Sequence, residues 1–153
     1  MVHVYLIQHG KAYPKEIDPD RKLTEEGIHE TELIAKHLSK VGVRVKRVVH
    51  SGKLRASMTA EILAKNLGVE KIESEDGLNP LDDPSTWRDK LIKIDEDIMV
   101  VGHLPHLSKL VSQLLNVDTE VVKFKYSGVL CLERGEDLKW VIKWYITPDV
   151  ITK

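Results

Sequence analysis

Two patterns of hydrophobic residues alternate along this chain, and together they predict its secondary structure. Short runs of apolar and β-branched residues, such as the one at 2–7, are typical of buried strands. Between these runs, apolar residues recur three or four positions apart, as in helices with one buried face. Thr24 is the expected N-cap of the first helix, and Gly42 and Gly68 follow the first two helices. The predicted strands are 2–7, 45–50, 69–72, 98–101, 121–126, 129–133 and 140–146, and the predicted helices are 24–40, 54–66, 85–94 and 105–116.

The order of these elements predicts the fold class. Strands and helices alternate over the first two thirds of the chain, and strands follow one another in the last third. This order favours an α/β fold with three layers, in which helices flank a mixed, mainly parallel sheet. The length of 153 residues, without a repeat or a linker, is expected to form a single domain over residues 1–153.

Composition narrows the possible functions. Apolar residues make up 42% of the chain and charged residues 31%, which is typical of a folded globular protein. The net charge of -1, with both signs interspersed, argues against a nucleic-acid partner. No apolar run approaches the ~20 residues of a membrane span, and the N-terminus lacks a signal-peptide pattern. We therefore expect a cytoplasmic protein with no membrane partner.

Three segments that could carry chemistry follow the ends of predicted strands. They are Gln8-His9-Gly10, residues 50–52 with Arg55 shortly after, and residues 102–105 with His103. Ligands of open α/β sheets bind outside the carboxyl ends of the strands. The sequence therefore predicts that His9, Arg55 and His103 converge on one crevice.

These residue types suit a phosphoryl group. A neutral imidazole can attack phosphorus and carry the phosphoryl group covalently, while a protonated one can stabilise the equatorial oxygens. Arg55 offers a planar fork of donors for phosphate oxygens, and the helix that begins near Pro105 presents free N–H groups to an anion. Taken singly, His9 and His103 could be structural histidines and Arg55 a solvated helix residue.

Two other chemistries receive little support. Cys131 is the only cysteine, and its alternating apolar surroundings indicate a buried, unreactive thiol. His103 and His106 have the spacing of a metal pair, but no carboxylate or cysteine accompanies them at ligand spacing. We expect no metal and no other cofactor.

The segments "LIQHGKA", "SGKLRASMTAEIL" and "VGHLPHL" resemble the histidine phosphatase superfamily, which also contains the phosphoglycerate mutases. The short chain, "GLNPLDD" and "WYITPDVI" are most similar to the SixA-type phosphohistidine phosphatases. The resemblance implies a phosphoglycerate mutase-like fold. It also implies that His9 is the phosphorylated nucleophile and that Arg55 and His103 bind the phosphoryl group. The resemblance makes four further residues candidate phosphate-binding positions: Gln8, Gly10, Ser51 and Leu104.

Two positions depart from the family pattern. Gly52 replaces a proline, which we expect to loosen one turn. Gln8 replaces an arginine, so the site loses one positive charge and one forked donor, and Lys11 is the nearest residue that could return the charge. A slowed enzyme is the first expectation, and a pseudo-phosphatase that only binds phosphate is the alternative.

The substrate is predicted from two missing features. The segment between 72 and 98 leaves little chain for a lid, and no carboxylate is firmly placed as a general acid; Glu75, Asp76 and Asp82 are the possible proton donors. An open crevice suits a phosphorylated side chain, and a leaving imidazole needs less protonation than an alkoxide. We therefore expect a protein phosphohistidine phosphatase, monomeric or weakly dimeric, that acts on a histidine-phosphorylated signalling or carrier domain. A small-molecule phosphomonoesterase of the same superfamily is the second expectation.

Overall fold

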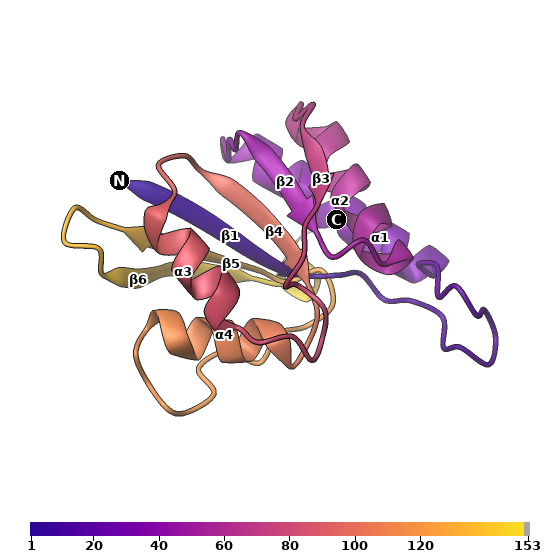
Figure 1. Ribbon diagram of the computed structural model, residues 1–153. Coiled ribbons are helices and arrows are strands. Elements are labelled where there is room, and N and C mark those ends of the chain that lie inside the picture. The colour runs from indigo at the N-terminus through magenta and orange to yellow at the C-terminus, as the bar shows by residue number, and fades with distance from the viewer. Residues whose placement is uncertain (152–153) are drawn as a thin grey trace.

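A six-stranded sheet lies at the centre of the computed structural model, with helices on both of its faces (Figure 1). The structure describes residues 1–151. In chain order the elements are β1 (Val2–Gln8), α1 (Glu25–Lys40), β2 (Arg47–His50), α2 (Leu54–Leu67), β3 (Ile72–Ser74), α3 (Ser85–Lys93), β4 (Ile98–Gly102), α4 (His106–Leu114), β5 (Val129–Arg134), β6 (Trp140–Ile146) and the 3₁₀ helix η1 (Pro148–Val150).

The strand order is β3-β2-β4-β1-β5-β6, which makes the sheet mixed but mainly parallel. β3, β2, β4 and β1 run parallel to one another, whereas β5 and β6 form antiparallel pairs at the other edge. The predicted α/β class and mixed sheet are confirmed.

Alternate residues of the strands face the two helical layers. On β1, Tyr5 and Ile7 belong to the core formed with α1 and α2, while Val4 and Leu6 belong to the core formed with α3 and α4. Figure 1 shows the pair α1 and α2 on one side of the sheet and the pair α3 and α4 on the other. These two cores fix the strands from both faces, so the loops at the strand ends are held at one edge.

The helix ends follow the expected chemistry. The Thr24 hydroxyl accepts a hydrogen bond from the Gly27 N–H at 2.9 Å and so caps α1. Gly68 ends α2 in the left-handed conformation, with φ of 68°. The third strand lies later than predicted, at Ile72–Ser74, because the chain after Gly68 remains bonded to the helix end through the Val69 N–H and the Ala64 carbonyl.

The predicted strand at 121–126 is wrong. Its alternation is real, because Val122 and Phe124 are buried in the core beside exposed lysines. No ladder forms, however, because β4 and β5 occupy both sides of β1 and the Lys125 N–H bonds to the Tyr145 hydroxyl instead, at 2.9 Å. This segment is therefore an extended loop that leads to the strand ends.

The lone cysteine lies in the core, as its surroundings predicted. Cys131 on β5 is buried, and burial raises the pKa of its thiol to about 11. The thiol is therefore protonated and unreactive at neutral pH. Within residues 1–151, every helix is too short or too polar to cross a lipid bilayer.

Candidate active site

The carboxyl ends of three parallel strands bring the sequence-predicted residues to one edge of the sheet. Gln8 of β1 is in register with Gly102 of β4, and His50 of β2 is in register with Val101 of the same strand. After β1 and β2 the chain continues to helices on one face of the sheet, and after β4 it continues to a helix on the other face. A crevice between such diverging loops is where open α/β sheets bind ligands.

His9 and His103 lie side by side in this crevice. Their ring centroids are 5.0 Å apart, with the planes tilted by 54°. The two residues are only 6% and 1% exposed, respectively. Both imidazoles are thus near enough to touch one small oxyanion from two sides.

Two hydrogen bonds fix the tautomer of His9. Its Nδ1–H donates to the Gly10 carbonyl at 2.7 Å, and its Nε2 accepts from Nε of Arg55 at 3.3 Å. Burial lowers the pKa of His9 to about 4, and the charge of Arg55 contributes. At neutral pH the ring is therefore neutral, with the lone pair of Nε2 available as a nucleophile.

Arg55 is not the only guanidinium near His9. Arg21 lies close enough for its charge to lower the pKa of both His9 and Arg55, secondary to burial. A bridge between Ala12 and Leu23 closes the intervening loop and brings Arg21 back to the strand end. Arg21 also holds a positive φ of 54° and donates from Nε to the Tyr13 carbonyl at 2.9 Å. The polar loop sequence contains nothing that distinguishes Arg21 from the lysines beside it.

His103 is held by Ser51. The Ser51 Oγ lies 2.6 Å from Nε2 of His103 and also accepts a hydrogen bond from the Lys53 N–H at 3.3 Å. Burial, followed by the proximity of His9 and Arg55, lowers the pKa of His103 to about 3. The His103 ring is therefore neutral at pH 7 in the free protein, and a bound anion would raise its pKa.

Packing and hydrogen bonding account for the glycine at position 10, and its role in phosphate binding stays a prediction. Its N–H donates to the Thr59 hydroxyl at 2.9 Å, and that hydroxyl donates to the Arg55 carbonyl at 2.7 Å. A Cβ at Gly10 would lie 2.8 Å from Oγ1 of Thr31, on the side of α1. Glycine is therefore required by packing against α1, and Thr59 connects the loop after β1 to the first turn of α2.

The turn after β2 is not loosened by Gly52. The residue adopts a φ of 91°, and its N–H donates to Nδ1 of His50 at 3.0 Å. A proline has neither that donor nor access to positive φ. Gly52 and His50 thus stabilise this turn together, which also gives His50 a structural role.

Gln8 and Leu104 border the histidine pair on the side of a groove. Gln8 is 8% exposed, and its Oε1 is buried without a hydrogen-bond partner in residues 1–151. Tyr126, from the extended loop, lies with its ring centroid 5.7 Å from that of His9. Sequence analysis missed Tyr126 because the residue is part of the segment interpreted as a strand. Lys11 does not replace the missing charge, because its Nζ pairs with Glu26 at 2.9 Å.

The three possible proton donors make other contacts. Glu75 lies 3.6 Å from Nζ of Lys90 and 3.9 Å from Nη1 of Arg47. Asp82 accepts a hydrogen bond from the Asn79 N–H at 2.9 Å, and Asp76 lines a hollow with Asp82. A role of Glu75, Asp76 or Asp82 in proton transfer stays a prediction.

Histidine, cysteine and carboxylate side chains do not gather into a metal site within the described chain. No three of them in residues 1–151 come together in a suitable cluster. His106, the second histidine of the predicted pair, is fully buried at the start of α4. The groups near the histidine pair are instead donors and cations suited to an anion.

Two imidazoles and a guanidinium at the strand ends of an α/β sheet are suited to binding an oxyanion such as a phosphoryl group, and similarity to known proteins identifies the family. The model of the histidine phosphatase superfamily (branch 1) matches residues 4–82. The chain therefore belongs to the histidine phosphatase superfamily, and the family predicted from its three motifs is confirmed.

Individual relatives differ in how much of the chain they share. The phosphohistidine phosphatase SixA of Escherichia coli is 27% identical over 96% of this chain and 94% of its own length. A structure of the protein histidine phosphatase SixA complexed with tungstate superposes with a TM-score of 0.88 and 25% identity, over 98% of this chain and 99% of that one. The mitochondrial serine/threonine-protein phosphatase PGAM5 of Mus musculus is 30% identical over 62% of this chain. The matched region spans about a third of PGAM5, 35% of its length.

Proposed function

We propose that this chain is a protein phosphohistidine phosphatase that works through a phosphohistidine intermediate on His9. The observation that carries the proposal is the state of that ring: Nδ1–H bonded to Gly10, Nε2 unprotonated, and Arg55 and His103 beside it. These groups are what a double displacement at phosphorus requires: a free nucleophile next to donors for the phosphoryl oxygens.

In the first step, the lone pair of Nε2 on His9 attacks the phosphorus of the substrate. The bond between phosphorus and the substrate's imidazole nitrogen breaks, and that nitrogen takes a proton from water. Arg55 donates to the phosphoryl oxygens during the transfer. His103 donates to the same oxygens, and the dianion raises its pKa from the low value of the free protein.

In the second step, water attacks the phosphorus of phosphohistidine-9. The bond to Nε2 breaks, its electron pair returns to the ring, and inorganic phosphate leaves with the water oxygen. The hydrogen bond from Nδ1 to Gly10 keeps the ring in place through both steps. Ser51 positions His103 in the same way, by the short contact to its Nε2.

A phosphohistidine substrate makes a smaller demand on a general acid than a phosphate ester does. The ordinary pKa of a histidine side chain, about 6.5, means that a departing imidazole is readily protonated by solvent. An alkoxide leaving group has no such advantage. The carboxylate of Glu75 is occupied by ion pairs, and the relative that matches 96% of the chain is named a phosphohistidine phosphatase. Both support a histidine-phosphorylated protein domain as the partner.

Turnover of a phosphohistidine peptide in the presence of a metal chelator tests this proposal. We expect hydrolysis by the wild-type chain, and a radiolabelled, acid-labile phosphoenzyme on rapid quenching. His9→Ala should abolish both, whereas His29→Ala, which removes an exposed histidine of α1, should retain them. Full activity in His9→Ala would refute the nucleophile assignment.

Gln8 favours a second candidate, a phosphate-binding protein with little activity. The glutamine supplies no positive charge at the position where the family has arginine. In that case vanadate should bind while neither a phosphohistidine peptide nor an aryl phosphate is hydrolysed. Turnover of an aryl phosphate alone would instead favour a small-molecule phosphomonoesterase.

A further inference from the structure

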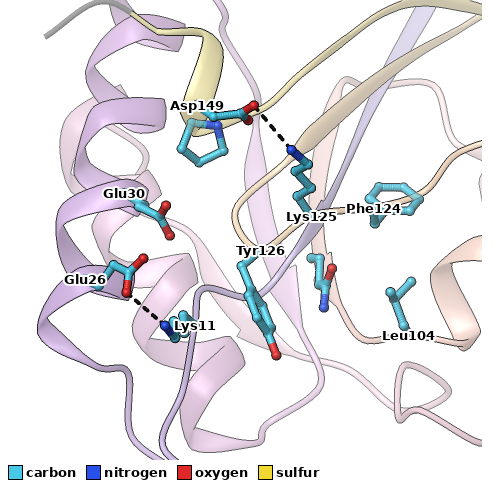
Figure 2. A pocket seen from close by; sticks show the side chains of 10 residues that line it. Lys11, Glu26, Glu30, Leu104, Phe124, Lys125, Tyr126 and Asp149 are labelled. Carbon is cyan, nitrogen blue, oxygen red and sulfur yellow. Dashed lines mark hydrogen bonds and ion pairs between the residues drawn. The ribbon is translucent and has the colours of Figure 1, made fainter.

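A groove of about 570 Å³ adjoins the histidine pair, and its chemistry differs from that of the phosphoryl site (Figure 2). Gln8, Leu104 and Tyr126 line the part of the groove next to His9 and His103. Leu104 is 36% exposed and Tyr126 41% exposed, so this end offers apolar surface to a ligand. The rest of the lining is Lys11, Glu26, Glu30, Phe124, Lys125, Pro148 and Asp149.

The charges of the groove do not balance. Lys11 pairs with Glu26 at 2.9 Å and Lys125 pairs with Asp149 at 3.2 Å, as the dashed lines in Figure 2 show. Within residues 1–151, Glu30 has no such ion pair. In Figure 2 it extends from α1 into the space between the two pairs. The two lysines and three carboxylates leave the groove with one uncompensated negative charge.

The surroundings of Glu30 favour a cation beside it. Partial burial raises the pKa of its carboxyl, and the neighbouring Glu26 raises it further. A positive group in the groove would relieve the repulsion and stabilise the ionised form. A small metabolite carrying a second phosphate or a carboxylate would be repelled by the same charge.

We propose that this groove docks the polypeptide around the phosphohistidine and that Glu30 selects a lysine or arginine on that polypeptide. The inference rests on the proposed function, because the groove is lined by Gln8 and Leu104, the chain neighbours of His9 and His103, and by Tyr126, whose ring centroid lies 5.7 Å from that of His9. An apolar side chain next to the phosphohistidine packs on Leu104 and Tyr126. A cationic side chain a few residues away reaches Glu30. Glu30 is thus a specificity residue that does not touch the reacting atoms.

Two phosphohistidine peptides test this assignment. They are identical except that the positions three and four residues after the phosphohistidine carry lysine in one and glutamate in the other. The wild-type chain should prefer the lysine peptide by about three- to tenfold in kcat/KM. Raising the salt from 50 to 500 mM should reduce this preference, because exposed charges are then screened.

Variants of Glu30 separate a local effect from overall charge. Glu30→Gln should remove most of the preference, and Glu30→Lys should reverse it. The readout is the ratio of the two kcat/KM values, so a general change in activity cancels. Glu61→Lys makes the same change in net charge on α2, in a hollow lined by other residues, and should leave the ratio as in the wild type. An unchanged ratio in both Glu30 variants, or an equal shift in Glu61→Lys, would overturn the assignment.

Failure of the proposed function would look different. In that case neither phosphopeptide is hydrolysed. The affinities of the groove for the two unphosphorylated peptides are then measured by fluorescence anisotropy. Tighter binding of the lysine peptide, lost in Glu30→Lys, still supports the groove. Equal binding of both peptides refutes it.

Discussion

Replacing Gln8 with arginine tests how much the phosphoryl site loses by having an amide at this position. Gln8 is the last residue of β1 and directly precedes His9, the proposed nucleophile. Its Oε1 is buried without a partner in the described chain, so the glutamine is poorly satisfied even before a ligand enters. An arginine here would remove that orphan acceptor and return a charge with a forked set of donors.

The size of the effect follows from one charge-assisted hydrogen bond. Such a bond to a charged group contributes about 1.5–3 kcal/mol. If the bond forms only when the phosphoryl group is in transit, the rate rises by about tenfold to a hundredfold. If the bond forms equally with the bound substrate, KM falls instead and kcat stays the same.

Steady-state kinetics with an aryl phosphate and with a phosphohistidine peptide distinguish these outcomes. Gln8→Arg should raise kcat/KM for both substrates and tighten vanadate binding, and Gln8→Met, which removes the amide at similar volume, should lower kcat/KM. A fall in kcat/KM for Gln8→Arg, in a variant whose melting temperature is unchanged, would refute the reasoning. It would mean that the glutamine amide makes a contact with substrate that arginine cannot make.

Three further predictions follow from the site geometry. Ser51→Ala should lower kcat several-fold with little change in KM, because His103 loses a hydrogen bond of about 1 kcal/mol; unchanged kcat would contradict its positioning role. Burial lowers the pKa of His9 to about 4 and that of His103 to about 3 in the folded protein. Below pH 6.5 the unfolded chain therefore binds more protons at these two residues than the folded chain does. Stability should therefore fall as the pH drops from 6.5 toward 4, and His103→Asn should flatten this loss in urea titrations at several pH values. Gly10→Ala should cost about 1–3 kcal/mol of folding free energy, because its Cβ would lie 2.8 Å from Oγ1 of Thr31; an unchanged melting temperature would contradict this packing.

The sequence was sufficient for the fold class and for the meeting of the three strand ends. Parallel strands flanked by helices expose their carboxyl ends at one edge, so residues that follow such strands must come together. This rule alone predicts that His9 and His103 come together, and their ring centroids are 5.0 Å apart. The strand at 121–126 could not be corrected in the same way, because alternating burial looks identical with and without a partner strand.

The sequence could not predict which side chains contact one another at the site. The charge of Arg21 acts on His9 because an isolated bridge closes a long polar loop, and nothing in the loop sequence indicates that closure. The roles of Gly10 and Thr59 depend on which direction the nucleophile loop turns after β1. Such contacts depend on backbone geometry between distant segments, which hydrophobic periodicity does not encode.

The positive charges that help burial to keep His9 unprotonated also attract a phosphoryl group to it. Burial is the main cause of the low pKa of His9, and Arg55 and Arg21 lower the pKa further because a proton adds a positive charge to the ring beside them. A phosphoryl group brings negative charge to the same nitrogen, so the same two guanidinium groups stabilise it. The low basicity of His9 therefore does not count against it as a nucleophile, since it keeps Nε2 free at every physiological pH and makes the ring a good leaving group when water attacks. Gln8 reduces the attraction for the anion, but it also spares the histidines a third charge that would lower their pKa values further.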